Sequence, residues 1–296
     1  MLRTRLWVGA CLIALVAGVL ALDRRLAPWF PFLFVLVLGL TLVACHELLA
    51  LLPSAGKPAA WLCYAGLIAL AAANWAPHIM NHFLGPARDR WNLQAWGCVA
   101  SVLALLVMTA FLVEMATFQA PGESLRRISL TVGIAAYLGL LGSFLAQLRW
   151  LPDLDGSSVS GKRATVALAA AIFVPKCCDI GAYFTGRFLG RHPMAPVLSP
   201  KKTWEGAAGG LAAAMLAAIA IEKLSGVPLL EGGIVIVAIF GLTLGIAGML
   251  GDLAESLIKR DCQRKDASQV VPGFGGVLDV VDSIVFAAPV TYWWLA

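Results

Sequence analysis

Charged side chains are scarce in this chain. Asp, Glu, Lys and Arg make up 13% of the residues, against about a quarter in an average soluble domain. Hydrophobic residues make up 60%, and the mean hydropathy is +0.85. This composition excludes a water-soluble enzyme, because one soluble core cannot bury so much apolar surface. The formal net charge of +5 is too small and too dispersed for a nucleic-acid partner, and it fits cationic loops beside anionic lipid.

A disulfide framework is not expected. The seven cysteines are an odd number and lie mostly inside apolar runs, such as Val43 to Cys45 and Leu62 to Tyr64. Paired cysteines are typical of small secreted domains with polar, loop-rich chains, which this sequence does not resemble. We expect the cysteines to pack as small hydrophobic side chains.

Long apolar runs are abundant, and they predict an all-α, polytopic integral membrane protein. A helix needs about 20 mainly apolar residues to cross a hydrocarbon core of roughly 30 Å. The first run also fits a signal peptide, but it lacks a clear cleavage site before Asp23. About nine transmembrane helices are predicted, with cores at Leu6–Leu22, Trp29–Leu52, Ala59–Ala76, Gln94–Phe118, Ile128–Leu148, Ala164–Phe184, Trp204–Ile221, Gly233–Leu250 and Val277–Ala296.

The distribution of lysine and arginine predicts the orientation. With nine helices, the side that holds the N-terminus carries 13 of these residues and the other side carries 8. Cytoplasmic loops are enriched in such residues, so we expect a cytoplasmic N-terminus. The last two cytoplasmic loops hold most of them, which also suggests an anion-binding site. We therefore divide the chain into a transmembrane scaffold, 1–151, and a catalytic region with cytoplasmic loops, 152–296.

The scaffold region holds few ionisable side chains within its apolar runs. His46 and Glu47 stand near the end of one run, and Glu114 lies inside another. Intramembrane ionisable groups are often functional. No second acid or base stands nearby in sequence, so we interpret these three as helix-end or interhelical hydrogen-bonding groups.

Polar groups become dense after Val174. Lys176, Asp179 and Tyr183 follow at spacings that place them on one helix face. A buried Lys and Asp on one face either form a closed ion pair or bind a charged ligand. Both alternatives remain open from the sequence.

The segment from Ser199 to Gly206 precedes another predicted helix. It contains two lysines, Lys201 and Lys202, beside hydroxyl groups and the free amides of a helix N-terminus. Both kinds of group bind anions, so the segment suits a polyphosphate. The Gly-x4-Gly-Lys-Ser/Thr spacing of a Walker A loop is absent. The alternative is a lysine pair that sets topology and contacts lipid headgroups.

The segment from Gly251 to Ser283 is the most informative. A polar stripe at helical spacing begins with Asp252 and Glu255, and Asp279 and Asp282 enter the last predicted helix. Carboxylates converging from two helices beside a cationic loop can hold divalent cations that bridge phosphates. The alternative, a solvated charge run followed by a glycine hinge, is less favoured because charges on inner turns of apolar helices are costly.

This segment resembles the signature of the phosphatidate cytidylyltransferase (CDP-diacylglycerol synthase) family. The resemblance covers about 110 residues. The positions at matching spacing are Ser256, Lys259, Arg260, Lys265, Asp266, Pro272, Gly275, Gly276, Asp279 and Asp282. The upstream positions similar to the family's other motifs are Cys178, Asp179, Gly181, Ala182, Tyr183, Gly186, Arg187, Ser199, Pro200, Lys201, Lys202, Thr203, Glu205 and Gly206.

The resemblance implies transfer of CMP from CTP to phosphatidate, at the cytoplasmic face of a bacterial inner membrane. It implies Mg2+, and it leaves open a second, monovalent cation and a homodimer. The catalytic residues implied are Asp252, Asp279, Lys259 and Asp266. The implied metal ligands are Asp252, Asp279 and Asp282. The substrate-binding residues implied are Lys201, Lys202, Thr203, Ser256, Arg260, Lys265, Asp179 and Ser199.

The sequence departs from the family pattern at two positions, and two other functions remain as alternatives. Phe274 stands where the family often has His, and Val280 stands where it often has Arg. We expect retained chemistry with a variant pocket, because neither position is a predicted metal carboxylate. The rivals are a CTP-dependent kinase of a polyprenol or phytol and an ion-coupled transporter. The transporter is disfavoured because the acids cluster at one membrane face.

Overall fold

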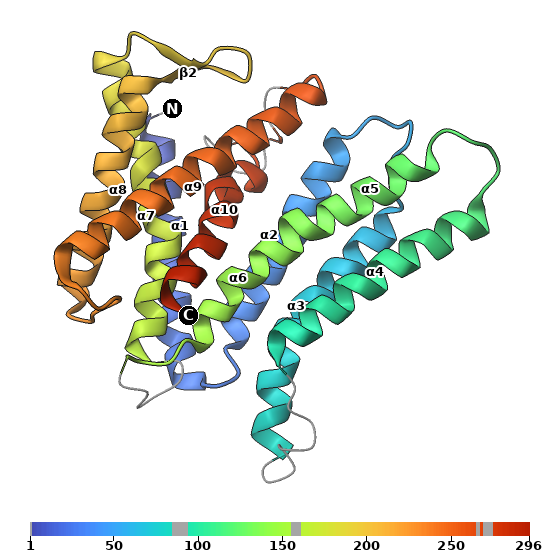
Figure 1. Cartoon of the computed structure of the whole chain (residues 1–296), viewed down its shortest axis with the longest axis horizontal. Coiled ribbons are helices and arrows are strands. Elements are labelled where there is room, and N and C mark those ends of the chain that lie inside the picture. Colours follow the sequence, from blue (N-terminus) through green and yellow to red (C-terminus); the bar gives the residue numbers. More distant parts are fainter. Residues whose placement is uncertain (1, 85–93, 155–160, 265–266, 269–274) are drawn as a thin grey trace. The chain divides into compact units, whose positions relative to one another are not determined.

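The protein is described by a computed structural model that covers residues 2–84, 94–154, 161–264, 267–268 and 275–296 (Figure 1). Among these residues, eight helices are long and apolar enough to cross a membrane. This confirms an all-α polytopic membrane protein. The remaining predicted span, Leu6–Leu22, falls in α1 (Leu2–Asp23), whose described apolar part, Trp7–Asp23, is shorter than the others.

The chain divides into two compact units. The first comprises Met1–Ala146 and Ser268–Val277, and the second comprises Gln147–Ala267 and Leu278–Ala296. Residues 268–277, which belong to the C-terminal signature segment, are therefore part of the first unit. The functional division at residue 151 that we predict from the sequence stays a prediction.

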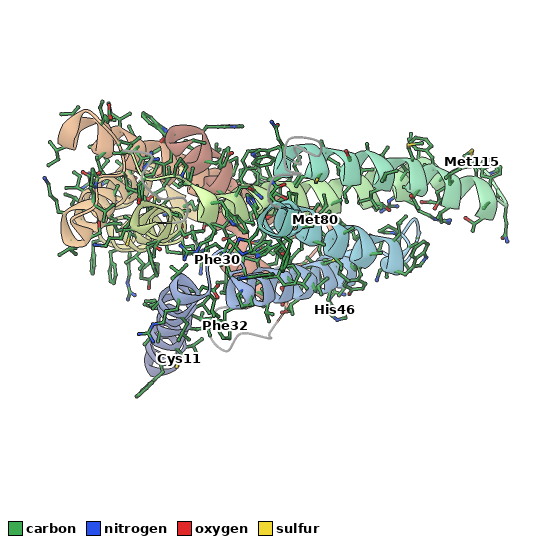
Figure 2. The ribbon with its side chains drawn as sticks, turned by 90° about the horizontal axis from the view of Figure 1, so that it is seen from below. Cys11, Phe30, Phe32, His46, Met80 and Met115 are labelled. Atoms are coloured by element: carbon green, nitrogen blue, oxygen red, sulfur yellow. The ribbon has the colours of Figure 1, made fainter. Side chains whose placement is uncertain are left out.

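The first unit is built from apolar helices. They are α1, the short η1 (Arg24–Leu26), α2 (Pro31–Leu51), α3 (Ala60–Leu84), α4 (Ala95–Thr117), α5 (Ser124–Ile134), η3 (Ala135–Leu140) and α6 (Leu141–Gln147). Buried leucine, isoleucine, valine and alanine side chains of α3, α4, α5 and η3 form one core cluster. Figure 2 shows Phe30 and Phe32 where α1 meets α2, and Met115 near the end of α4. The backbone N–H groups of Phe32 and Leu33 donate to the Asp23 carboxylate, which caps α2.

The second unit contains η4 (Leu148–Trp150), α7 (Lys162–Leu189), β1 (Pro193–Ala195), β2 (Ser199–Thr203), α8 (Trp204–Ser225), α9 (Gly233–Asp261) and most of α10 (Val277–Leu295). Helix α8 packs along α7 (Figure 1). A Cβ added at Gly210 of α8 would lie 2.8 Å from the carbonyl oxygen of Cys178 and 2.9 Å from the Ala182 Cβ. Only glycine permits this approach of the two helices.

One local feature differs from the sequence prediction. The segment before α8, predicted as a loop, forms an antiparallel hairpin in which Pro193 pairs with Thr203 and Ala195 with Ser199. Helix α9 continues to Asp261, beyond its apolar core, which ends at Leu250. This confirms that the polar stripe beginning with Asp252 lies at the end of that helix.

Candidate functional site

A close approach of α9 and α10 brings the acids of the second unit together. Gly251 of α9 contacts the backbone of Asp282 in α10. A Cβ at Gly251 would lie 3.1 Å from the carbonyl carbon of Asp282 and 3.1 Å from the Phe286 Cβ. The missing side chain therefore sets the spacing between Asp252, which follows Gly251, and Asp282.

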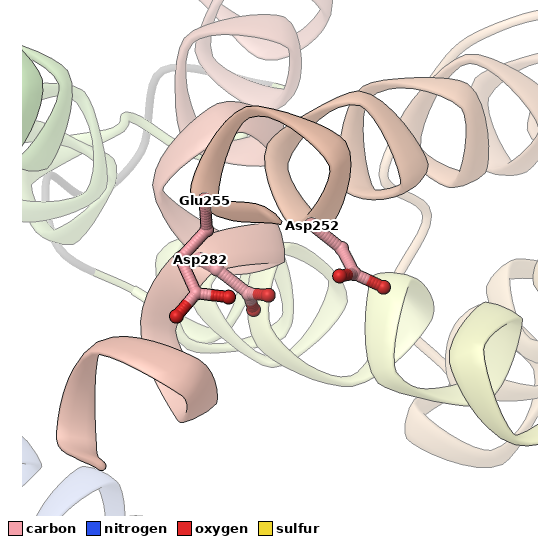
Figure 3. A group of neighbouring side chains, drawn as sticks. All are labelled: Asp252, Glu255 and Asp282. Carbon is pink, nitrogen blue, oxygen red and sulfur yellow. The ribbon is translucent and has the colours of Figure 1, made fainter. Parts of the chain in front are cut away.

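Three carboxylates meet at this point. Asp252 and Glu255 come from α9 and Asp282 from α10, and one oxygen of each lies within 4.8 Å of the other two (Figure 3). The Glu255 and Asp282 residues are 1% and 4% exposed. The Asp252 side chain is 32% exposed, so the group is reachable from its side.

The donor set of this group fits a hard divalent cation. Within the described part of the chain, no hydrogen-bond partner reaches the buried Glu255 Oε1. Leaving such an oxygen unsatisfied is costly. Carboxylate oxygens are the ligands that Mg2+ and similar cations prefer. The orphaned oxygen and the three clustered carboxylates therefore suit a cation.

Three lysines pair with the acids of this region. Lys202 Nζ of β2 lies 2.8 Å from Asp252 Oδ2. Lys259 Nζ lies 2.7 Å from Glu255 Oε2 and 2.6 Å from Asp279 Oδ1.

The third lysine joins α7 to α10. Lys176 Nζ of α7 lies 3.3 Å from Asp282 Oδ1 and 3.6 Å from Asp179 Oδ2. Ser283 Oγ donates to Asp179 Oδ2 at 3.4 Å. Lys176 and Asp179 therefore do not form a closed ion pair, because Lys176 also contacts Asp282, one of the three clustered carboxylates.

We call these eight side chains the acid–lysine cluster: Asp179, Asp252, Glu255, Asp279, Asp282, Lys176, Lys202 and Lys259. With every group charged, five carboxylates face three ammonium groups, an excess of two negative charges. Burying uncompensated charge is expensive. A divalent cation would neutralise this excess.

The structure places the three predicted metal ligands in two different environments. Asp252 and Asp282 stand together, whereas Asp279 pairs with Lys259. Glu255, which belongs to the predicted polar stripe but not to the ligand set that the resemblance implies, completes the group. Its spacing of three residues from Asp252 was the available signal, because it puts both side chains on one face of α9.

The predicted phosphate-binding lysines of β2 also differ. Alternate residues of a strand face opposite sides. Lys202 accordingly reaches Asp252 while Lys201 is exposed. Thr203 caps α8, accepting a hydrogen bond from the Gly206 N–H at 3.1 Å. Ser199, at the other end of β2, is half-buried.

Contacts at both ends hold the hairpin in place. Glu205 of α8 accepts hydrogen bonds from the backbone N–H groups of Arg191 and His192, at 3.0 and 3.2 Å. Arg260 Nε of α9 donates to the Leu198 carbonyl at 3.3 Å. The hairpin is thereby fixed beside the last turns of α9.

The remaining predicted residues divide into two sets. Ser256 is buried in α9, one turn beyond Asp252. Tyr183 does not join the cluster, because its hydroxyl accepts a hydrogen bond from Arg187 at 2.9 Å and its side chain is exposed. Three residues, Lys265, Asp266 and Phe274, lie outside the described residues.

The polar groups of the first unit behave differently from one another. His46 Nδ1 lies 3.2 Å from the Tyr64 hydroxyl, and Glu114 lies 3.7 Å from Arg127. These contacts confirm the predicted interhelical roles. Glu47 is buried and accepts a hydrogen bond from the Val277 N–H. Nothing in its sequence neighbourhood indicates so distant a partner.

Comparison with known proteins identifies the family of this chain. The sequence profile of the cytidylyltransferase family matches residues 3–296. A Mycobacterium bovis protein named phosphatidate cytidylyltransferase is 31% identical over 260 residues, which cover 84% of this chain and 75% of that protein. A Bacillus subtilis protein of the same name is 33% identical over 196 residues, covering 66% of each chain.

Some relatives match a shorter stretch of this chain at higher sequence identity. A Brucella suis protein, again named phosphatidate cytidylyltransferase, is 43% identical over 139 residues. That match spans 47% of this chain and about half of the relative, 49%. The profile match extends over nearly the whole sequence, including the helices that carry the acid–lysine cluster. This chain belongs to the cytidylyltransferase family.

Proposed function

We propose that this protein is a phosphatidate cytidylyltransferase, which transfers CMP from CTP to phosphatidate and releases pyrophosphate. The acid–lysine cluster carries the proposal, because its carboxylates suit a divalent cation and its lysines suit phosphate oxygens. Membership of the cytidylyltransferase family and the name that its relatives carry, phosphatidate cytidylyltransferase, support it.

The chemistry requires little more than alignment and charge neutralisation. A phosphate oxygen of phosphatidate attacks the α-phosphorus of CTP. The bond from that phosphorus to the oxygen shared with the β-phosphate breaks, and pyrophosphate leaves with the bonding electrons. A phosphate monoester is nucleophilic near neutral pH, so the site needs no strong general base.

The residues of this chain supply the binding groups. Asp252, Glu255 and Asp282 would hold the Mg2+ cofactor, which when bound neutralises the triphosphate and steadies the leaving pyrophosphate. Lys202 and Lys259 would exchange their carboxylate partners for phosphate oxygens. We assign Asp279 to the orientation of Lys259, which it contacts at 2.6 Å.

We place the site at the cytoplasmic face of a bacterial inner membrane. Asp252 to Lys259 lie in the last turns of α9, so the cluster stands toward one end of that helix. The cationic hairpin reaches the same end through the Lys202 contact. Loops rich in lysine and arginine stay in the cytoplasm, where CTP is available.

Placement of radiolabel tests the function. Purified protein receives phosphatidate in detergent micelles, Mg2+, and CTP labelled at either the α- or the γ-phosphate. The proposal expects α-label in the lipid and γ-label in released pyrophosphate. Label from the γ-phosphate in lipid would indicate a CTP-dependent kinase. Solute uptake by proteoliposomes without CTP turnover would indicate a transporter. Light scattering of the same preparation tests the predicted homodimer.

A further inference from the structure

A buried acid of the first unit has no part in the proposed chemistry. Glu47, in α2, is 2% exposed. Its Oε1 accepts hydrogen bonds from the Ser268 hydroxyl at 2.5 Å and from the Val277 backbone N–H at 2.9 Å. One carboxylate oxygen therefore joins both ends of the segment 268–277.

The second contact lies at the beginning of α10. Val277 is the first residue of that helix. The first N–H groups of a helix lack partners within the helix, and a carboxylate there both accepts a hydrogen bond and interacts favourably with the helix dipole. The usual acceptor in such a cap is the side chain of the residue before the helix. Here that residue is Gly276, which has none.

Glycine at 276 makes room for the acid. A Cβ at this position would lie 2.9 Å from the carboxyl carbon of Glu47. Ordinary contacts of this kind are about 3.5–4.0 Å. The Glu47 carboxylate thus occupies the place that a local capping side chain would fill.

We propose that Glu47 is a positioning residue that fixes the start of α10 and hence the carboxylates of that helix. Asp279 and Asp282 follow Val277 by two and five residues along the same helix. At about 1.5 Å rise per residue, they stand within roughly 8 Å of the anchored end. A shift or rotation of that end displaces both. The inference rests on the proposed function.

A purely structural explanation accounts less well for the acid. Glu47 is buried in the last turns of α2, where an ionisable side chain is costly unless it is hydrogen-bonded, and an apolar residue would pack there at lower cost. A Ser or Asp at 276 would cap α10 without help from another helix. The carboxylate does what neither alternative does, because it ties Ser268 and Val277 to one point on α2.

The test compares the full-length wild type with Glu47→Gln and Glu47→Ala. Glu114→Gln is the matched control, since Glu114 is another acid within a span of the same unit and pairs with Arg127. Each purified protein is measured for kcat, for KM of CTP, and for Mn2+ affinity by electron paramagnetic resonance. The Mn2+ titration requires no turnover.

We expect Glu47→Ala to lower kcat and Mn2+ affinity about 10–100-fold, the usual cost of losing a group that orients metal ligands. The KM for CTP should rise less than kcat falls, because Glu47 acts on the substrate only indirectly, through Asp279 and Lys259. Glu47→Gln keeps an acceptor oxygen and should lose about three- to tenfold, since it lacks the charge. The control should match the wild type in all three constants.

Unchanged kcat and Mn2+ affinity per folded molecule in both variants, with only a lower yield, would overturn the proposal. If Glu47→Ala does not fold, the same constants are measured for Glu47→Gln and Gly276→Ala. The methyl group of Gly276→Ala would press against the Glu47 carboxylate, so this variant should also lower kcat and Mn2+ affinity. Failure of the proposed function is separate: the wild type would then make no CDP-lipid, while the Mn2+ titration would still report whether Glu47 positions the acids.

Discussion

Gly251→Ala is the sharpest test of how the site is assembled. The added Cβ would clash with the Asp282 carbonyl oxygen, and it would lie 3.1 Å from both the Asp282 carbonyl carbon and the Phe286 Cβ. Heavy atoms that are not bonded to each other prefer about 3.5–4.0 Å, so α9 and α10 must part by roughly 1 Å. Such overpacking costs about 1–3 kcal/mol of folding free energy. A displacement approaching 1 Å in a reacting group can cost about 100-fold in rate.

We therefore expect Gly251→Ala to fold, with a melting temperature lowered by a few degrees and kcat lowered about 10–100-fold. Melting followed by tryptophan fluorescence in detergent gives the first quantity, and CDP-lipid formation gives the second. Gly39→Ala is the control, because no described atom outside the adjoining backbone of its own helix lies within 4 Å of the added Cβ.

The reasoning fails if Gly251→Ala keeps both the wild-type melting temperature and the wild-type kcat. It also fails if Gly39→Ala loses as much activity as Gly251→Ala. In either case the distance between α9 and α10 would not govern the arrangement of Asp252 and Asp282. A lowered melting temperature with normal kcat would mean that Gly251 contributes to stability but not to the rate of the reaction.

Three further predictions concern the cluster itself. Asp252→Asn removes a charge without changing shape and should lower turnover more than about 100-fold, beyond the usual cost of a supporting group; near-normal turnover would remove Asp252 from the metal site. Asp279→Asn should raise the KM for CTP through Lys259 more than it raises the Mg2+ concentration for half-maximal rate, and the opposite order would make Asp279 a ligand. Lys202→Ala should raise the KM for CTP more than Lys201→Ala, because Lys201 is exposed, and equal values would contradict this.

Much of the fold was predictable because lipid imposes a simple rule on the sequence. Backbone groups within the hydrocarbon must bond internally, so each long apolar run forms a helix. The predicted run Trp29–Leu52, for example, became Pro31–Leu51, and Gln94–Phe118 became Ala95–Thr117. The hairpin before α8 was missed because its five-residue strand, Ser199–Thr203, contains Pro and two Lys rather than an alternating apolar pattern.

The site was predictable in composition but not in pairing. Helical spacing places Asp252 and Glu255 on one face, and family resemblance indicates Asp279 and Asp282. Which acid faces a lysine depends on the rotation of α10 against α9, which Gly251 and its contacts determine. No local pattern encodes that rotation. The partnership of Lys259 with Asp279 therefore required the structure.

The contacts of Glu47 have a consequence for biosynthesis. Its two partners follow it by 221 and 230 residues in the chain. At a synthesis rate of about 5–20 residues per second, roughly 10–50 s separate the appearance of α2 from that of α10. During that interval Glu47 must find water or another partner near the membrane surface. Its part of the first unit is therefore completed only when the ribosome has nearly finished, so fragments that stop after α6 should be recognised by quality-control proteases as incomplete.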